Sequence, residues 1–370
     1  MQTRNAIPLP ENSAQRSAAK FLSFSDQWDS PKVGAFCFDA QSEILGAYHL
    51  INWMAEKIRG GAEIEIAVER QSANGGKNLK PGRDYELLRK CLKINPLIAE
   101  GYDLSPDMEA WLELCRDPSF SRIAYICHER QALAEDAVDI MREILARYRA
   151  VITDHAHRKR CYNAAGSAKR RRDSIVKVIK QGHYLCDEPE IALLDLLWMP
   201  ECRMRKTLTE SCASYTKFIN GVRHHSASRD VIAAIFCLER SDSKGVHISG
   251  LVLSKPGAGN SAANLGHYWR DNVTKGEGGF LCATDKPLAS MLSKWSGFPL
   301  TGLAAPVDGN SDPARLQFLE VVITRFAELS PKLRANGEGS RHRQLRIFKS
   351  ERLRNMEEIV RSDVGRGGMK

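Results

Sequence analysis

Residues Val231–Asp285 read VIAAIFCLERSDSKGVHISGLVLSKPGAGNSAANLGHYWRDNVTKGEGGFLCATD, and this stretch decides the fold. Two apolar, β-rich runs, Val231–Leu238 and Val246–Leu253, flank a polar connection that contains Asp242 and Gly245. Alternating apolar residues on both sides of a short turn-forming segment are typical of an antiparallel hairpin. The sequence therefore predicts two adjacent strands joined by a tight connection.

Glu239 and His247 lie at the facing ends of these two predicted strands. Glu239 ends the first strand and His247 opens the second, so the turn should bring the carboxylate and the imidazole within a few ångströms of each other. Such a pair can form half of a divalent-metal site. The alternative is that both side chains simply cap strand ends at the surface.

The residues around the hairpin extend the pattern to strand–helix–strand–strand–helix. Ile191–Trp198 is an apolar run, Lys206–Val222 has its apolar residues on one helical face, and a helix is predicted around Asn264–Asn272. This order of elements is that of a ferredoxin-like sheet, also called a split βαβ sheet.

Three short blocks of residues follow one another through this region. They are a strand-ending glutamate with a Gly-x-His strand after it, a Gly-x-Tyr-Trp helix, and a Thr-Lys-Gly-x-Gly loop that ends near a cysteine. Their order and spacing resemble the inovirus-type replication protein family, also known as the YagK/YfjJ C-terminal domain family. With weaker similarities in the flanking segments, the resemblance covers roughly Ala192 to Ser350. The matching residues are Glu239, Gly245 and His247, then Gly266, Tyr268 and Trp269, then Thr274, Lys275, Gly276, Gly278 and Cys282.

The resemblance implies an HUH-type replication initiator, an enzyme that nicks single-stranded or hairpin DNA with the help of a divalent metal such as Mg²⁺ or Mn²⁺. It implies His247 and Glu239 as metal ligands, and it places Asp195 where the family's first strand carries an acid. For Asp195 the alternative is an acid at a strand edge or end.

Two departures from the family pattern fall at positions that carry chemistry. The family's second motif histidine is replaced by Ser249, which is a poor metal ligand compared with imidazole. The family's tyrosine, the nucleophile that attacks DNA phosphate, is replaced by Arg325, which has no nucleophilic oxygen. We expect that the fold is kept and the nicking activity weakened or lost. If nicking survives, Tyr268 or a metal-activated water would serve as the nucleophile.

The whole chain is predicted to be α+β, with a mostly helical N-terminal region before the antiparallel sheet domain. Composition and periodicity divide it into a disordered segment over residues 1–30, a mostly helical region over 31–180 with a basic stretch over 141–180, the replication-type domain over 181–350, and a basic tail over 351–370.

The formal net charge of +9 is concentrated rather than spread. Residues 141–180 hold twelve lysines and arginines against three acids, which is typical of a surface that binds a phosphate backbone. The alternative is a solvated face. In the third block, Lys275 and the backbone amides of its loop could meet a phosphate. In the second block, Trp269 could stack on a base, but its place one helical turn from Leu265 favours packing into the sheet. The predicted nucleic-acid contacts are Arg158, Lys159, Arg160, Lys169, Arg170, Arg171, Arg172, Lys275 and Trp269.

Other features restrict the class of protein. His155 and His157 lie in a basic stretch and are expected to meet solvent or phosphate rather than metal. Ten cysteines occur without a C-x-x-C pair, which argues against a zinc knuckle. No apolar stretch is long enough to span a bilayer and no signal-peptide core is present, so we expect a cytoplasmic protein without a membrane partner.

These observations predict a DNA-binding protein of phage or mobile-element origin that resembles a rolling-circle replication initiator. Two alternatives remain: an active metal-dependent DNA nicking endonuclease, and a protein-interaction scaffold.

Overall fold

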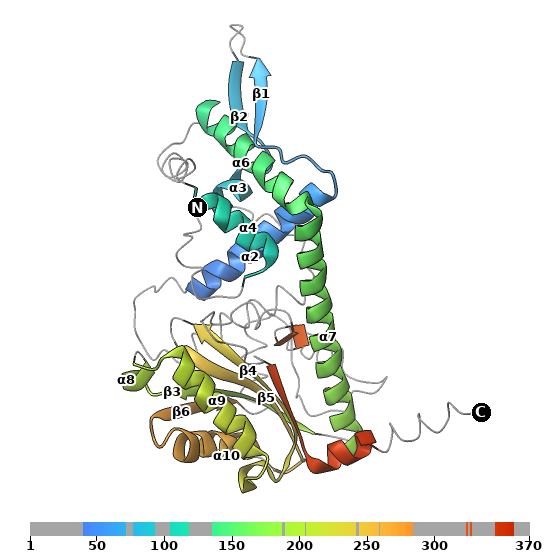
Figure 1. Cartoon of the computed structure of the whole chain (residues 1–370), viewed down its shortest axis with the longest axis vertical. Coiled ribbons are helices and arrows are strands. Elements are labelled where there is room, and N and C mark those ends of the chain that lie inside the picture. The colour runs from blue at the N-terminus through green and yellow to red at the C-terminus, as the bar shows by residue number, and fades with distance from the viewer. Residues whose placement is uncertain are drawn as a thin grey trace, which may run out of the picture. The chain divides into compact units, whose positions relative to one another are not determined.

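A computed structural model describes residues 40–71, 77–92, 104–117, 135–186, 189–203, 205–241, 244–258, 260–283, 323–324, 326–327 and 345–358. These residues form two compact units that divide between Ser167 and Ala168. The chain is α+β, as expected: its first unit is mostly helical and its second contains a five-stranded antiparallel sheet (Figure 1). The predicted boundary at residue 180 and the observed division both lie inside one long helix, α7 (His155–Leu185).

The first unit consists of helices and one small hairpin. Its core includes a T-shaped contact between Trp111 and Tyr148, with ring centroids 5.2 Å apart, and the Trp111 indole N–H donates to the Cys91 carbonyl at 3.1 Å. Asp154 separates α6 from α7, because its carboxylate accepts from the backbone N–H groups of Ala156 and His157 and so caps the new helix. The elements are α2 (Ala40–Arg59), β1 (Ala67–Gln71), β2 (Lys77–Pro81), α3 (Tyr85–Leu92), α4 (Pro106–Cys115), α6 (Glu135–Thr153) and the start of α7.

The second unit is organised around an antiparallel sheet with the strand order β6-β3-β5-β4-β7. The predicted hairpin is confirmed as β4 and β5, and the predicted first strand as β3. The strands are β3 (Glu190–Trp198), β4 (Val231–Ser241), β5 (Gly245–Ser254), β6 (Gly278–Ala283) and β7 (Leu345–Lys349). The helices are the end of α7, α8 (Pro200–Arg203), α9 (Leu208–Val222), the 3₁₀ turn η1 (Ser226–Ser228), α10 (Ser261–Tyr268), its π-helical continuation η2 (Trp269–Val273), and a helix over 351–358.

One face of the sheet carries the main apolar core of this unit. Because side chains alternate along a strand, the even-numbered residues of β3 and β5 share this face with those of β4. They pack against α9 and α10, which cover the sheet on one side in Figure 1. A capping box between Thr207 and Glu210 starts α9, as its Thr-x-x-Glu spacing favours.

The opposite face of the sheet meets the second half of α7. Val178 and Leu185 of α7 lie in a cluster with Ala233 of β4 and Leu353. Gly182 allows close approach here, because a Cβ at that position would lie 2.9 Å from a methyl group of Leu253. Glu357 is within 2.6 Å of the Lys349 ammonium and 3.3 Å of the Lys177 ammonium. Burial raises the pKa of Glu357, but these hydrogen bonds and one from Gln181 outweigh it and lower the pKa to about 2.

No helix in the described part of the chain combines the length and the apolar character needed to cross a lipid bilayer.

We expect Gly221→Ala to destabilise the second unit through the hydroxyl of Tyr268. A Cβ at position 221 would lie 1.9 Å from the hydroxyl oxygen. Overpacking of this kind costs about 1–3 kcal/mol, against a gain in helix propensity of about 1 kcal/mol. Urea unfolding of Gly221→Ala, Tyr268→Phe and the double variant measures the balance. Tyr268→Phe should recover most of the loss, because the nearest remaining ring carbon lies 3.1 Å away. An equal loss with and without the hydroxyl would contradict this packing.

Candidate functional site

The predicted metal residues lie together on the face of the sheet opposite α9 and α10. In the registers of three neighbouring strands, Asp195 of β3 pairs with Ser249 of β5, and His247 of β5 pairs with Glu239 of β4. All four are at most 6% exposed. Side chains alternate between the two faces of a strand, and these four residues, all odd-numbered, point to the same face. The hairpin therefore brings Glu239 and His247 together as predicted, in the interior rather than at the surface.

The hydroxyl of Ser249 joins the two carboxylates. Its oxygen lies 2.8 Å from Asp195 Oδ1 and 3.2 Å from Glu239 Oε2. A hydroxyl has a single proton, so it can donate fully to only one of these oxygens at a time. Ser249 therefore acts in this cluster as a hydrogen-bond donor to carboxylates.

Lys244 completes the cluster, and sequence reasoning missed it. Its side chain is 0% exposed, and Nζ lies 2.8 Å from Asp195 Oδ2. Lys244 belongs to the connection between β4 and β5, where a lysine among serine, aspartate and glycine is typical of a solvated turn. The next residue, Gly245, has a φ of +63°, which lets the chain turn directly into β5.

His247 is held with one nitrogen toward the backbone and the other toward the cluster. Nδ1 lies 3.0 Å from the Gly245 carbonyl oxygen and must carry a proton to make that hydrogen bond. Nε2 lies 3.7 Å from Glu239 Oε2. Metal-binding histidines are commonly fixed in this way, with the second ring nitrogen donating to a carbonyl. The imidazole orientation therefore suits a ligand.

The charges of the cluster nevertheless favour an internal ion pair over a bound ion. Two buried carboxylates need compensation in a low-dielectric interior, and the Lys244 ammonium supplies it at Asp195. In addition, Asp195, Glu239 and His247 do not bring three ligand atoms within 4.8 Å of one another, whereas one other group among the described residues does. A divalent metal would have to displace the ammonium from Asp195.

Tyr268, the candidate nucleophile, is not placed with this cluster. It belongs to the layer of α9 and α10 on the other face of the sheet, where its ring lies 4.3 Å from that of His225 and 6.0 Å from that of Phe218. Burial raises the pKa of its hydroxyl, which disfavours the phenolate. Its position is that of a packing residue.

Of the two roles considered for Trp269, the structure supports packing into the sheet and contradicts the base contact. The side chain is 1% exposed, its indole N–H donates to the Leu197 carbonyl at 2.9 Å, and its ring packs edge-on against Trp198. The turn of η2 directs it into the core. Although Trp269 is next to Arg270 in the sequence, its buried ring is not exposed for stacking on a base.

The loop after η2 is also occupied by its own hydrogen bonds. The Gly276 amide donates to the Arg270 carbonyl, and the Glu277 amide donates to the Thr274 carbonyl. The Gly278 amide donates to the Thr274 hydroxyl. These amides are therefore not free for a phosphate, contrary to expectation. Lys275 remains exposed, at a φ of +56°.

The remaining predicted nucleic-acid contacts all lie on α7. Arg158, Lys159 and Arg160 are exposed on its part in the first unit, and Arg160 pairs with Glu109. Lys169 and Arg170 are exposed on its part in the second unit, whereas Arg171 and Arg172 are half-buried. The Arg171 guanidinium donates to the Ala327 carbonyl at 2.8 Å.

A second charged group lies in the first unit, around Asp107. Ligand atoms of Asp107, His157 and Cys161 all lie within 4.8 Å of one another, so they could hold a metal ion. His157 is therefore not the solvent-facing residue that its basic surroundings predicted: it is 5% exposed, with Nε2 2.9 Å from Asp107. The spacing of His157 and Cys161, four residues apart on α7, places them on one helical face.

This group already contains a cation. The Arg59 guanidinium pairs with Asp107 and lies 3.4 Å from the Cys161 sulfur. Burial and the nearby Asp107 raise the pKa of the Cys161 thiol to about 11, so the thiol is protonated, while a metal binds the thiolate. A metal would have to displace both Arg59 and the thiol proton.

Several predictions concern residues outside the described part of the chain. Arg325, which the resemblance aligns with a catalytic tyrosine, lies outside the described residues, as do residues 1–30 and 359–370. The described part of the predicted basic tail is helical over 351–358.

Comparison of the chain with protein-family models, characterised proteins and solved structures finds no match.

We expect Lys244→Met to destabilise the second unit by about 3–5 kcal/mol, because it leaves the Asp195 carboxylate buried without its ammonium partner. Adding Asp195→Asn should recover a large part of the loss, since the carboxylate that lost its ammonium partner is then replaced by a neutral amide. Lys255→Met is the matched control: Lys255 pairs with Asp230 at 3.0 Å but is half exposed, so its loss should stay within about 1 kcal/mol. Urea unfolding measures the free energy of unfolding of these variants. If the losses from Lys244→Met and Asp195→Asn simply add in the double variant, the ion pair is contradicted.

For the Asp107 group we expect Co²⁺ to bind Arg59→Ala more strongly than the unaltered chain, because the guanidinium pairs with the Asp107 carboxylate and lies against the Cys161 sulfur. A thiolate-to-Co²⁺ absorption band in the near ultraviolet reports binding. The band should disappear when Cys161→Ser is added to Arg59→Ala. Equal binding with and without the guanidinium would show that Arg59 is no barrier.

Proposed function

We propose that this chain is a DNA-binding protein whose second unit is a replication-initiator-type domain with a disabled metal centre. Divalent-metal-dependent nicking is lost, and recognition of single-stranded or hairpin DNA is kept. The chain would belong to a phage or another mobile element.

The strand order supports this type of domain. The elements follow one another along the chain as β3–α9–β4–β5–α10–β6, and in the sheet the strands lie in the order β6-β3-β5-β4, each antiparallel to its neighbours. Both orders are those of a ferredoxin-like sheet, to which β7 adds a fifth strand. In this interpretation His247 and Ser249 lie on a central strand, flanked by the acids of its two neighbours. That is where a metal-dependent nicking centre of this type would be assembled.

The observation that carries the proposal is the position of Lys244. Its ammonium lies 2.8 Å from Asp195, inside the group of side chains that the resemblance assigns to the metal. The ion pair with this lysine can offset the charge of the buried Asp195 in place of a metal ion. It cannot activate a water or orient a phosphate as a divalent metal does.

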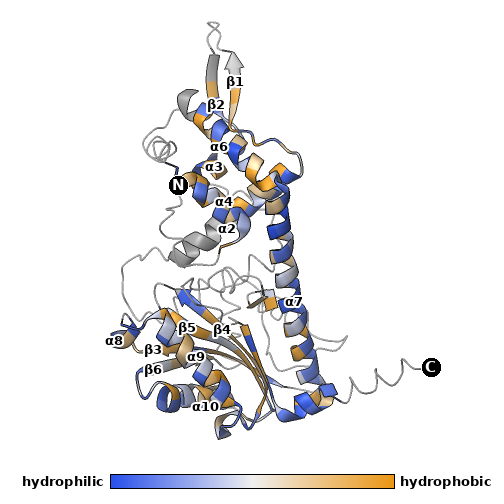
Figure 2. Ribbon diagram, viewed as in Figure 1, coloured by the Kyte–Doolittle hydropathy of each residue, from blue (hydrophilic) through white to orange (hydrophobic). Residues whose placement is uncertain are grey.

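DNA binding is supported by the distribution of charge. α7 carries nine lysines and arginines, and its one acidic residue is Asp173. The nine are Arg158, Lys159, Arg160, Lys169, Arg170, Arg171, Arg172, Lys177 and Lys180. Figure 2 shows this helix hydrophilic along most of its length. Dense positive charge of this kind binds a phosphate backbone by releasing its counterions.

We expect the purified chain to shift labelled single-stranded and hairpin DNA in a gel without cutting it. Affinity should fall at least about tenfold between 50 and 200 mM salt, since several phosphate contacts are involved. Chelation of Mg²⁺ and Mn²⁺ should leave the shift unchanged, and so should His247→Ala. Denaturing gels test for a nicked strand joined to protein.

Two outcomes would overturn the proposal. A covalent protein–DNA product that requires metal and disappears in His247→Ala would show that the centre is active. Absence of any salt-sensitive shift would reject DNA binding altogether and favour a protein-interaction scaffold.

A further inference from the structure

The outward surface of α7 combines cations with exposed aromatic rings. Within the second unit, Lys169, Arg170, Lys177 and Lys180 are exposed on this helix, and so is Tyr184. At 3.6 residues per turn these five positions fall within an arc of about 100°. They form one strip, here called the basic–tyrosine strip. Asp173 lies within its arc, and Lys177 also pairs with Glu357 at 3.3 Å.

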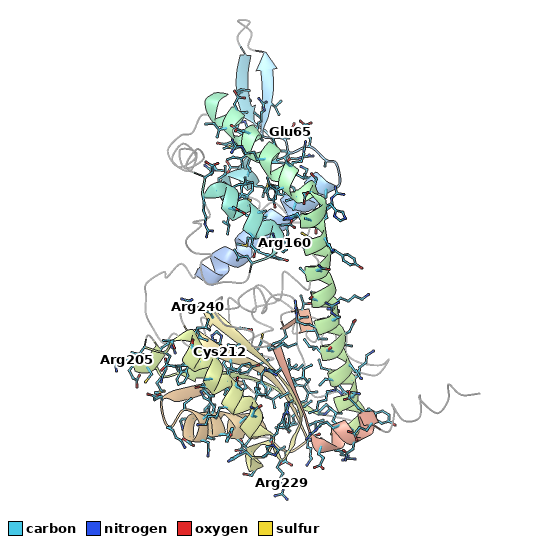
Figure 3. All side chains as sticks on the ribbon, in the orientation of Figure 1. Glu65, Arg160, Arg205, Cys212, Arg229 and Arg240 are labelled. Atoms are coloured by element: carbon cyan, nitrogen blue, oxygen red, sulfur yellow. The ribbon has the colours of Figure 1, made fainter. Side chains whose placement is uncertain are left out.

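The strip lies opposite the buried side of the same helix. Ile175, Val178, Ile179 and Gly182 are buried, and helical geometry centres them about 180° from the strip. Since the buried side packs against the sheet, the strip is turned away from it. Figure 3 shows long side chains standing out from α7.

Tyr184 is unusual in its exposure. It is 81% exposed, although a tyrosine normally buries most of its ring. Among the described residues, few large hydrophobic side chains are exposed, and the two most exposed are Tyr184 and Tyr162, both on α7. Neither ring is needed for packing, so both are available to a ligand.

The first-unit part of α7 repeats the combination. Tyr162 is 79% exposed there, and Arg158 and Lys159 lie within an arc of about 100° that includes it. Buried His157 lies on the opposite side. Each part of the helix thus presents cations beside a bare aromatic ring.

We propose that the outward face of α7 binds single-stranded DNA, with the cations on the phosphates and the faces of Tyr162 and Tyr184 stacked on unpaired bases. This inference rests on the proposed function and adds to it the surface and the strandedness. Unpaired bases offer the flat faces that an exposed ring can stack on, and each stack contributes about 1–3 kcal/mol. Paired bases are already stacked within the duplex, so a duplex would engage the cations alone.

Fluorescence anisotropy with a labelled oligo(dT) strand and with a duplex of equal length tests the proposal on the full chain. Tyr162→Ala and Tyr184→Ala should each weaken binding of the single strand by about 5- to 100-fold. The corresponding phenylalanine variants should bind almost normally, because they keep the ring. Duplex affinity should be the same in all four variants.

A charge-matched pair of variants tests the cations. Lys169→Gln with Lys180→Gln should reduce the slope of log affinity against log salt by about 1.4, the loss of two contacts to a single strand. Arg223→Gln with Arg229→Gln removes the same charge from exposed positions around η1, outside α7, and should leave the slope unchanged. All these residues are exposed, so the fold should be retained, which circular dichroism checks.

The outcomes separate this inference from the proposed function. Salt-sensitive binding that is unaffected by both tyrosine variants, or equally affected by the two charge pairs, would overturn the α7 surface and leave DNA binding intact. Tighter binding of an RNA strand of the same length would overturn the choice of DNA. If the unaltered chain binds neither the single strand nor the duplex, the proposed function itself is rejected.

Discussion

The register between β4 and β5 is the constraint on which the second unit depends. It pairs Glu239 with His247 and Cys237 with Ser249, and it leaves Phe236 and Leu238 facing α9 and α10. A slip of one residue would move every side chain to the opposite face, so polar groups would enter the apolar core while phenylalanine and leucine left it. The apolar face and the charged cluster are thus two results of one alignment.

The charged cluster imposes a cost that the apolar face does not. Burying carboxylates is unfavourable unless each finds a partner, and the partners here come from different elements. Lys244 reaches Asp195 from the hairpin connection, Ser249 joins Asp195 and Glu239 across three strands, and the backbone of the connection holds His247. The connection therefore both closes the hairpin and supplies the cation. This explains how the domain keeps two carboxylates buried in its interior.

Periodicity in the sequence was enough to predict the elements but not their partners. The hairpin, the first strand and the helix before the hairpin follow from alternating or helical spacing, and the structure has all three. Lys244 could not be found in this way, because a lysine in a polar turn carries no signal of burial. His157 was misjudged because its partner Asp107 is 50 residues away in sequence. For Trp269 the helical spacing to Leu265 favoured core packing over a base contact, and the structure buries both side chains in the same core.

The charge on α7 is difficult to explain as a requirement of folding. Like charges three or four residues apart, such as Lys169 with Arg172 and Lys177 with Lys180, destabilise a helix. Tertiary contacts offset this in the second unit: Gly182 packs closely on Leu253, and Glu357 draws Lys177 toward the helix over 351–358. A neutral outer face would make the same helix more stable at no loss of packing. The proposed binding of single-stranded DNA would account for the cations and the two exposed tyrosine rings, which the fold alone does not require.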